Sequence, residues 1–359
     1  MQVAIVEPFY SGSHKTWVDS LCRFLAADCI TFTLPGRHWK WRMGAGAIQL
    51  AKDVNQSNEV IDVFLVTDML DVAVFKSLLS AEKSKTKIVL YMHENQVVYP
   101  FQTSDEDKNR DLHYGLINYK SMLAADAVWF NSSFHRDIWF SELALFLKLF
   151  PDAGFHSKEA VACKKKSTVI PLGIDSATID SNRVDKSQTP AILWNHRWEY
   201  DKNPDLFFNT LIRLSDEGHA FDLYVMGENY SQSPGIFKKA KEHLDHHIKH
   251  WGFVDDRKTY YELLWRCNML PVTANQEFFG LSVLEAMYCD VQPLLPNRLS
   301  YSDLYSSLDI FYSTDDDFYS TLKTMLSNFT LRSFRTDVSS YHWNIVVKLY
   351  DEELVKVLQ

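Results

Sequence analysis

Short apolar runs recur along the whole chain and alternate with longer segments that have helical periodicity. The runs are nearly continuous and rich in Val, Ile, Leu and Phe, which is typical of parallel strands buried on both faces. We predict strands at 3–6, 30–34, 63–67, 87–92, 127–130 and 168–172, and again at 191–195, 222–226, 249–254, 269–273, 291–295 and 310–312. This alternation predicts an α/β fold built on doubly wound parallel sheets.

The alternation pauses once, in a polar segment over residues 176–189 that has little apolar periodicity. A chain of 359 residues is too long for one ordinary core, so the pause predicts a linker between two Rossmann-like domains, 1–175 and 190–340. The last segment, 341–359, has the periodicity of a helix. Because open α/β sheets bind ligands beyond the carboxyl ends of their strands, we expect the two domains to face one cleft.

Composition excludes several classes of protein. A net charge of -9 lacks the basic excess of a protein that grips nucleic acid non-specifically, although it leaves room for a local basic patch. The 5 cysteines are scattered and form no C-x-x-C pair, which argues against a disulfide framework or a zinc site and favours a reducing compartment. The first residues lack the basic region of a signal peptide, and no apolar stretch is long enough to cross a bilayer. We therefore expect a cytoplasmic protein with no membrane partner.

Two glutamates, Glu277 and Glu285, form the sharpest functional signal, in the string E-F-F-G-L-S-V-L-E. They follow a predicted strand and flank a turn that opens a predicted helix, so free N–H groups at Phe279, Gly280 and Leu281 would face a phosphate. One carboxylate can accept hydrogen bonds from sugar hydroxyls and the other from ribose hydroxyls. A capped helix with a solvated glutamate at each end explains the same spacing equally well.

A loop with two cations follows the first strand of the second predicted domain, in N-H-R-W-E-Y-D-K-N-P. Arg197 can clamp a phosphate with two hydrogen bonds, and Lys202 can act as a compact charge beside it. Pro204 suits the first turn of the next helix. An ordinary charged surface loop explains this string when it is taken alone. Together with the glutamate pair, it favours a phosphate site.

Two polar segments follow strands of the first predicted domain. The loop P-F-Y-S-G-S-H-K-T-W contains Gly12 and His14, and its small residues let backbone N–H groups approach an anion, although it is no full G-x-G-x-x-G. The second segment, Y-M-H-E-N-Q-V-V-Y-P, delivers four polar side chains at a strand end: His93, Glu94, Asn95 and Gln96. A hydrogen-bonded loop with a structural histidine is the alternative for this segment.

Indoles alternate with cations in H-W-K-W-R, which contains His38, Trp39, Lys40, Trp41 and Arg42. Aromatic rings can stack on bases while cations meet phosphates, so this segment predicts contact with RNA. A partly buried tryptophan pair beside a solvated basic face is the alternative, and the sequence favours neither.

Two other clusters resemble metal sites but have simpler explanations. The acidic triple at 315–317 follows Ser313 and Thr314 at the start of a periodic segment, so helix capping explains it. Four histidines between 243 and 250 match no closed zinc pattern and are expected on a solvated helix face.

These motifs resemble known families at two levels. E-F-F-G-L-S-V-L-E and N-H-R-W-E-Y-D-K-N-P resemble the E-x7-E motif and the phosphate loop of retaining GT-B glycosyltransferases. E-P-F-Y-S-G-S-H-K, T-L-P-G-R-H-W-K-W-R, Y-M-H-E-N-Q-V-V-Y-P, Y-G-L-I-N-Y-K-S-M-L-A-A-D and W-F-N-S are more closely similar to the glycosyltransferase-like family that contains tRNA-queuosine mannosyltransferase. The specific motifs cover about the first third of the chain, whereas the second domain matches the superfamily alone.

The resemblance implies a GT-B fold and a GDP-mannose donor that binds the second domain without a metal. It assigns the diphosphate to Arg197 and Lys202, the sugar to Glu277, and the ribose to Glu285, with Phe279 and Gly280 in the sugar loop. It implies a retaining transfer without a protein nucleophile, in which the two cations stabilise the leaving diphosphate.

For the first domain, the resemblance implies binding of the acceptor, queuosine at the wobble position of tRNA(Asp). It places His93 beside the sugar and Gly12 and His14 on the phosphate side, and it implies that the helix at 341–359 crosses back to this domain. The residues leave open two alternatives, namely the same transfer to a lipid or glycan and a non-catalytic module that binds sugar nucleotides or RNA. No basic amphipathic helix supports a membrane-facing version.

Overall fold

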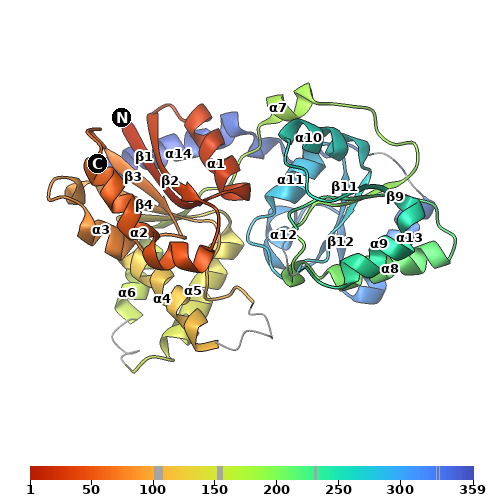
Figure 1. Cartoon of the computed structure of the whole chain (residues 1–359), viewed down its shortest axis with the longest axis horizontal. Helices are drawn as coiled ribbons and strands as arrows, with labels where there is room; N and C mark the ends of the chain where they lie inside the picture. Colours follow the sequence, from red (N-terminus) through yellow and green to blue (C-terminus); the bar gives the residue numbers. More distant parts are fainter. Residues whose placement is uncertain (101–107, 152–156, 230–232, 329, 331) are drawn as a thin grey trace. The chain divides into compact units, whose positions relative to one another are not determined.

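The computed structural model describes residues 1–100, 108–151, 157–229, 233–328, 330 and 332–359, which form two compact units (Figure 1). Unit 1 consists of Met1–Gly173 and Trp343–Gln359, and unit 2 consists of Ile174–His342. Each unit contains one 6-stranded sheet in which neighbouring strands run parallel. The α/β class predicted from the apolar runs is therefore confirmed.

The sheet of unit 1 has the strand order β2-β1-β3-β4-β5-β6. Its strands are β1 (Gln2–Tyr10), β2 (Asp28–Pro35), β3 (Val63–Thr67), β4 (Lys87–Met92), β5 (Ala127–Phe130) and β6 (Ser167–Val169). Strand β6 ends earlier than predicted, because Pro171 has no N–H to add to the ladder. The order reverses between β1 and β3, which makes their carboxyl ends a switch point of the kind that binds ligands.

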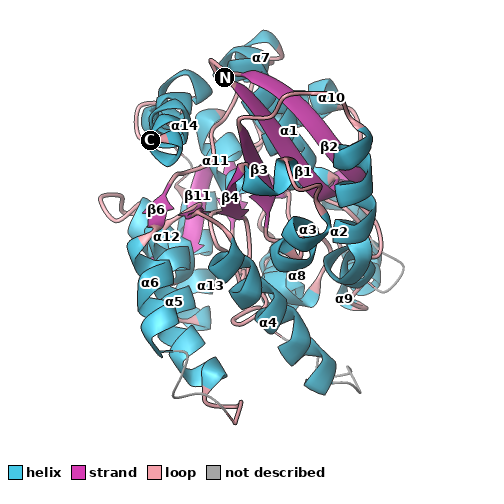
Figure 2. Cartoon of the chain, turned by 90° about the vertical axis from the view of Figure 1, so that its left-hand side faces the viewer, coloured by secondary structure: helices cyan, strands magenta, loops and turns pink. Residues whose placement is uncertain are grey.

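Helices cover both faces of this sheet. They are α1 (Gly12–Phe24), α2 (Trp39–Gln56), α3 (Val72–Leu78), α4 (Lys108–Ala124), α5 (Ser133–Leu147), α6 (Ser157–Lys165) and α14 (Trp343–Leu358), with a short 3-10 turn at Lys83–Lys85. Helices α2, α3 and α4 lie side by side (Figure 2), and α2 to α6 share one core that contains Phe75 and Trp139. Helices α1 and α14 contact each other, and the Trp17 indole donates to the Tyr350 hydroxyl at 3.0 Å.

The sheet of unit 2 has the order β12-β11-β10-β7-β8-β9, which reverses between β10 and β7. Its strands are β7 (Ala191–Trp194), β8 (Asp222–Val225), β9 (Ile248–Trp251), β10 (Met269–Pro271), β11 (Gln292–Pro296) and β12 (Phe311–Tyr312). Its helices are α7 (Ser176–Ser181), α8 (Pro204–Asp216), α9 (Ile236–His243), α10 (Arg257–Arg266), α11 (Leu281–Tyr288), α12 (Leu299–Leu304) and α13 (Asp315–Ser327), with 3-10 turns at Tyr200–Lys202, Asp245–His247 and Ser339–Tyr341. The buried Trp194 ring packs against Phe207 and Phe208 in its core.

Local chemistry explains where unit 2 departs from the predicted elements. The segment 176–189, predicted as a linker, begins with α7, because the Asp175 side chain caps this helix by accepting from the Thr178 N–H. Strand β9 ends before Gly252, which adopts a φ of 133°. The acidic triple forms the first turn of α13 and takes part in its cap, since the Thr314 hydroxyl accepts from the Asp317 N–H at 3.1 Å and Asp317 Oδ2 accepts from the Ser313 N–H at 2.8 Å.

The histidine cluster has a structural role in part, because the His247 ring stacks on Phe221 at 3.9 Å.

None of the helices among the described residues combines the length and the apolar character that crossing a bilayer requires.

Candidate functional site

The loops that follow β7 and β10 meet at the switch point of unit 2. The Thr273 hydroxyl donates to the Lys202 carbonyl at 2.8 Å, and the Asn275 N–H donates to the Asp201 carbonyl at 2.7 Å. Since β7 and β10 are neighbours in the sheet, their carboxyl ends bring the predicted cation loop beside the predicted glutamate loop. This edge is the candidate functional site of unit 2.

Lys202 lies at the centre of this site and is buried. Its Nζ is 2.8 Å from the Gln276 carbonyl, 3.3 Å from Glu277 Oε2 and 3.2 Å from Asp201 Oδ2. Burial by itself would lower the pKa of Lys202, but the carboxylates of Glu277 and Asp201 raise it above its ordinary value. Lys202 is therefore a fixed positive charge.

Glu277 is the matching negative charge. Burial would raise its pKa, but the Lys202 ammonium outweighs burial and lowers the pKa below its ordinary value. Its Oε1 accepts from the N–H groups of Phe278 at 3.2 Å and Phe279 at 3.4 Å. The sequence predicted that the Phe279 N–H would be free to face a phosphate, whereas here Glu277 accepts from it, because the loop turns back on its own side chain.

The turn after Glu277 depends on Gly280, which has a φ of 90° and precedes α11. A Cβ at this position would lie 3.0 Å from the Tyr301 ring, so both the backbone angle and the space favour glycine. Leu281 begins α11, as predicted, and the Phe279 side chain is buried, with its ring 5.8 Å from that of Tyr341.

Arg197 lies on the same loop as Lys202 and is more exposed. Its Nη2 is 3.3 Å from Glu199 Oε2, and 40% of its side chain is accessible. The guanidinium is close enough that its charge acts against the ammonium of Lys202. The site therefore carries one buried cation and one half-exposed cation.

Glu285 lies in α11 and is held by residues of α10. Its Oε1 is 2.7 Å from Arg257 Nη2 and accepts from the Tyr261 hydroxyl at 3.2 Å, while Oε2 accepts from the Tyr260 hydroxyl at 3.2 Å. Asn195, at the end of β7, approaches the Tyr260 hydroxyl at 3.5 Å, which connects this cluster to the strand edge. Arg257, Tyr260 and Tyr261 of α10 were not predicted from the sequence, because periodicity alone does not show which helix their side chains reach.

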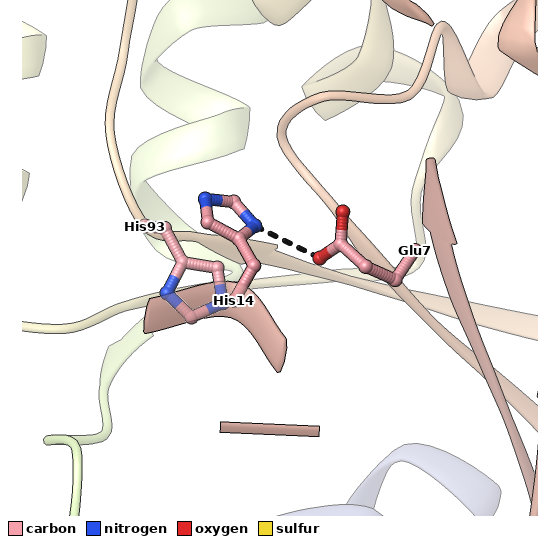
Figure 3. A group of neighbouring side chains, drawn as sticks. All are labelled: Glu7, His14 and His93. Carbon is pink, nitrogen blue, oxygen red and sulfur yellow. Dashed lines mark hydrogen bonds and ion pairs between the residues drawn. The ribbon is translucent and has the colours of Figure 1, made fainter. Parts of the chain in front are cut away.

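The switch point of unit 1 gathers a second set of ionisable groups. Glu7 lies in β1, His14 in α1, and His93 directly after β4, and Figure 3 shows the three side chains together. Glu7 Oε2 is 2.9 Å from His14 Nδ1, and the ring centroids of His14 and His93 are 4.3 Å apart. Asp68 follows β3 and accepts from the His93 N–H at 2.7 Å.

The surroundings shift the pKa values of these groups in different directions. Burial would lower the pKa of His14, but the carboxylates of Glu7, Asp68 and Glu94 raise it to about 9. Burial raises the pKa of Asp68 to about 8. Burial and the nearby His14 charge keep the pKa of His93 well below its ordinary value, so His93 is neutral.

Glu7, His14 and His93 also offer three possible metal-ligand atoms within 4.8 Å of one another. The contact of 2.9 Å between Glu7 Oε2 and His14 Nδ1 is a hydrogen-bond distance. The geometry thus favours a shared proton at this position.

The remaining predicted residues of the strand-end segment have different surroundings. Asn95 is buried, and its Oδ1 accepts from the N–H groups of Val97 and Val98 at 3.1 Å, so it shapes the loop. Glu94 is half-buried and accepts from the Gln96 amide at 2.9 Å. Gly12, at the start of α1, has a φ of 50° and open space around its Cβ position.

The predicted RNA segment lies at the start of α2. His38 precedes the helix with a φ of 56° and is exposed, as is Lys40, whereas Arg42 donates to the Pro35 carbonyl at 3.1 Å. Trp39 is half-buried, with its ring 5.2 Å from that of Tyr114. The Trp41 side chain is 68% exposed, so Trp41 is the indole with an accessible face.

Comparison with known proteins gives matches along most of the chain. Residues 2–174 match the family model of the tRNA-queuosine alpha-mannosyltransferase N-terminal domain, and residues 176–310 match glycosyl transferases group 1. A tRNA-queuosine alpha-mannosyltransferase from Drosophila melanogaster is 32% identical over 323 residues, which cover 87% of this chain and 84% of that protein.

Solved structures match over nearly the whole length. The sucrose-phosphate synthase from Thermosynechococcus elongatus has a TM-score of 0.72 at 13% identity and covers 99% of each chain. The lipopolysaccharide outer core galactosyltransferase WaaB in its apo form has a TM-score of 0.64 at 12% identity, again over 99% of each chain. Identity this low shows the fold alone, which is the GT-B fold.

Proposed function

Because the chain belongs to the tRNA-queuosine alpha-mannosyltransferase family, we propose that it transfers mannose from GDP-mannose to the cyclopentene-diol of queuosine in tRNA(Asp). It is a glycosyltransferase of the GT-B fold. The observation that carries the proposal for the donor is the contact between the buried Lys202 and the partly buried Glu277 at the switch point of unit 2. The family-specific match over residues 2–174 supports the acceptor.

The unit 2 site suits a sugar diphosphate. We assign the diphosphate to Arg197 and Lys202, which supply a half-exposed and a buried cation at one strand edge. We assign the sugar hydroxyls to Glu277, because a carboxylate kept ionised by Lys202 is an acceptor of hydrogen bonds only. Glu285 takes the ribose hydroxyls and exchanges part of its contact with Arg257 for them.

These residues also suit the chemical step. As the bond between the sugar and the diphosphate breaks, negative charge grows on the leaving phosphate, where two fixed cations and the amino end of α11 stabilise it. The acceptor hydroxyl attacks from the face that the diphosphate leaves, and a phosphate oxygen takes its proton, which retains the configuration. Arg197 and Lys202 supply the charge for which other enzymes use a divalent metal.

We assign the acceptor contacts to two segments of unit 1, namely the start of α2 and the polar segment that follows β4. Trp41 offers an exposed ring for base stacking, Lys40 offers charge for phosphates, and His38 offers ring nitrogens for hydrogen bonds. Glu94 and Gln96 are partly accessible and can accept or donate to the diol. A tRNA acceptor and the 5 cysteines, which the structure shows as free thiols, fit a cytoplasmic location.

Mass spectrometry of tRNA tests the proposal. Purified protein is incubated with queuosine-containing tRNA(Asp) and either GDP-mannose, GDP-glucose, UDP-glucose or UDP-galactose, and the nucleosides are then analysed. We expect one added hexose on queuosine with GDP-mannose alone, and none on tRNA(Asp) that carries guanosine instead. Hexose transfer to a lipid or glycan without tRNA would replace the acceptor assignment. Hydrolysis of each donor without tRNA, measured in parallel, tests the donor assignment separately from the acceptor assignment.

A further inference from the structure

A hollow with a basic lining lies at the amino edge of the unit 1 sheet, away from the proposed donor and acceptor contacts. Strands β4, β5 and β6 are neighbours in this sheet and begin at this edge. The hollow has a volume of about 350 Å³, and the last turns of α14, whose end is marked C in Figure 2, also line it. Its charged lining residues are Lys87, Lys165, Lys166, Lys356, Asp126 and Glu353. We call this site the amino-edge hollow.

The lysines of the amino-edge hollow come from three segments that are far apart in the chain. Lys87 begins β4, Lys165 and Lys166 lie between α6 and β6, and Lys356 lies in the last turns of α14. The fold therefore gathers them, and they are more than a run of charges in the sequence. Four lysines and two carboxylates leave this lining with an excess of positive charge, although the chain has a net charge of -9. Charge thus favours an anionic ligand.

Two of the lysines are held in place by the carboxylates of the hollow, and one is not. Lys87 Nζ is 2.9 Å from Asp126 Oδ1, and Lys356 Nζ is 2.5 Å from Glu353 Oε1. Lys165 is exposed and has no hydrogen bond or ion pair within the part of the chain that the structure describes. Its ammonium is available to a ligand without breaking a contact of the fold.

Lys166 is the half-buried cation of the hollow. Its Nζ donates to the carbonyl of Ala125 at 2.5 Å. Burial lowers the pKa of Lys166, and the charge of Lys76 adds to this effect in spite of the Asp126 carboxylate. The fold by itself therefore leaves this ammonium incompletely compensated, and a bound oxyanion would stabilise it.

The lining fits a nucleic-acid backbone better than a small organic molecule. Pockets for small molecules are lined mainly by apolar and aromatic side chains, whereas most side chains that line the amino-edge hollow are charged. Lys87, Lys165 and Lys356 are exposed and flexible point charges. Such side chains bind backbone phosphates and fix the position of the nucleic acid without reading its bases.

The hollow and the acceptor segments lie at opposite edges of the same sheet. Strand β4 begins at Lys87 in the hollow and ends at Met92, directly before the polar segment that contains Glu94. Six residues of extended strand separate the two edges by about 20 Å. A phosphate in the hollow therefore belongs to a different part of the RNA from the nucleotide that carries queuosine.

We propose that the amino-edge hollow binds backbone phosphates of the tRNA at a distance from the nucleotide that accepts the sugar. The choice of RNA as the anion rests on the proposed function. In this role the lysines contribute affinity and orient the tRNA on unit 1, and they take no part in the transfer of the sugar. Their contribution should depend on salt and be independent of the tRNA sequence.

Direct binding of tRNA tests the proposal with a double variant, Lys165→Gln with Lys356→Gln. Lys166 is left in place, because it also donates to a backbone carbonyl. The charge-matched control is Lys238→Gln with Lys239→Gln, which removes two exposed lysines of α9 in unit 2. Filter binding is measured for each protein with queuosine-containing tRNA(Asp) at several salt concentrations. A third protein, Lys165→Arg with Lys356→Arg, keeps both charges and shows whether charge or packing is responsible.

We expect the Lys165→Gln, Lys356→Gln protein to bind tRNA about tenfold more weakly at low salt, with a salt slope that is smaller by about 2. The arginine protein and the unit 2 control should bind like the parent. Parent affinity and an unchanged salt slope in the double variant would overturn the proposal. Loss of affinity in the arginine protein as well would also contradict it, because the effect would then come from packing.

Steady-state kinetics separate binding from chemistry. We expect the double variant to raise KM for tRNA while kcat at saturating tRNA and the hydrolysis of GDP-mannose without tRNA stay unchanged. A fall in kcat with an unchanged KM would contradict a role in tRNA binding. Calorimetry with pyrophosphate distinguishes the source of the anion. Binding of pyrophosphate to the parent but not to the double variant, with unchanged affinity for tRNA, would replace the RNA by a free oxyanion.

The failure of this inference can be told apart from the failure of the proposed function. If the parent protein mannosylates tRNA and the double variant binds tRNA as the parent does, the proposed function stands and the role of the hollow falls. If the parent protein neither binds nor modifies tRNA, the acceptor assignment itself falls, and the identification of RNA as the anion falls with it.

Discussion

Lys202 Nζ lies 3.3 Å from Glu277 Oε2, although 75 positions separate the two residues in the chain. Each residue stabilises the charged form of the other. The carboxylate of Glu277 raises the pKa of Lys202, and the ammonium of Lys202 lowers the pKa of Glu277. A comparable relationship joins Glu7 and His14 in unit 1. Both units thus pair a carboxylate with a basic side chain where their strand order reverses.

We expect Lys202→Met to abolish measurable hydrolysis of GDP-mannose and to destabilise unit 2. The substitution leaves the buried carboxylate of Asp201 and the partly buried carboxylate of Glu277 without their cation, which costs about 3 kcal/mol. Urea unfolding and a hydrolysis assay at a temperature where the variant is folded measure the two effects. Lys186→Met is the matched control, because Lys186 is a half-buried lysine of the same unit that donates to the carbonyls of Cys267 and Cys289. Full turnover in folded Lys202→Met would remove this lysine from the reaction.

Arg197→Ala should lower kcat by about a hundredfold with little change in stability. The guanidinium is 40% exposed and makes a surface contact with Glu199, so its removal leaves the core intact. Arg213→Ala is the control, because Arg213 forms a similar exposed pair with Glu217. Steady-state kinetics and thermal unfolding check the prediction, and near-normal turnover of Arg197→Ala contradicts it.

Arg257→Met should raise KM for GDP-mannose several-fold while kcat stays within about twofold, because Arg257 holds Glu285, to which we assign the ribose, and has no assigned contact with the reacting bond. Arg335→Met serves as the control, since Arg335 pairs with Asp180 and the Tyr288 hydroxyl instead. A change in kcat alone would place Arg257 nearer to the chemistry than we propose.

Trp41→Ala should weaken tRNA binding by about tenfold and leave donor hydrolysis unchanged, because one base stack contributes about 1 to 3 kcal/mol. Trp41 is 68% exposed, whereas Trp39 packs on Tyr114, so replacing Trp39 would disturb the fold as well. Val60→Ala, at a position that is 78% exposed, controls for loss of an exposed apolar side chain. Filter binding at several salt concentrations separates stacking from charge, and an unchanged affinity would locate the RNA elsewhere.

The stability of the fold should fall as the pH drops below 6.5. Burial lowers the pKa of His135 to about 3 and that of His196 to about 4, whereas both histidines titrate near 6.5 in the unfolded chain. The unfolded state therefore binds more protons, and unfolding becomes easier by about 1 to 2 kcal/mol per histidine between pH 6.5 and 5. His14 has the opposite effect, since its raised pKa gives stability that is lost as the pH rises toward 9.

His135→Gln provides the check on this pH dependence. The free energy of unfolding of the parent protein and of the variant is measured by urea unfolding at pH 7 and at pH 5. The difference between the two proteins should be smaller at pH 5, because the variant has no histidine to protonate at this position. An identical pH dependence in both proteins would mean that His135 is not the group responsible.

The strand pattern of both sheets follows from the sequence, because a strand buried on both faces needs a continuous apolar run. Lys202 and Glu277 were found for a similar reason, since each follows such a run within a few residues. Glu7 was not among the predicted site residues, because it directly follows the apolar run at 3–6 and lies inside β1. A charged residue in a buried strand is itself a signal, and its partner lies one loop further along the chain.

Asp68 shows what the same reasoning leaves out. It directly follows β3, as His93 follows β4, and a rule that inspects every strand end would have found it. Arg257, Tyr260 and Tyr261 are different, because only the packing of α10 against α11 brings them to Glu285. A site residue can thus be predicted from the sequence when it directly follows a strand. It cannot be predicted in this way when only the packing of two helices brings it to the site.

The route of the chain also has a consequence for biosynthesis. Unit 2 is one uninterrupted segment, whereas unit 1 lacks Trp343 and Tyr350 of α14 until residues 343–358 have left the ribosome. Until then Trp17, whose indole donates to Tyr350, has an uncovered face. The unit that is translated first is therefore completed last, and a nascent chain stalled before residue 343 should expose this face of the sheet to chaperones.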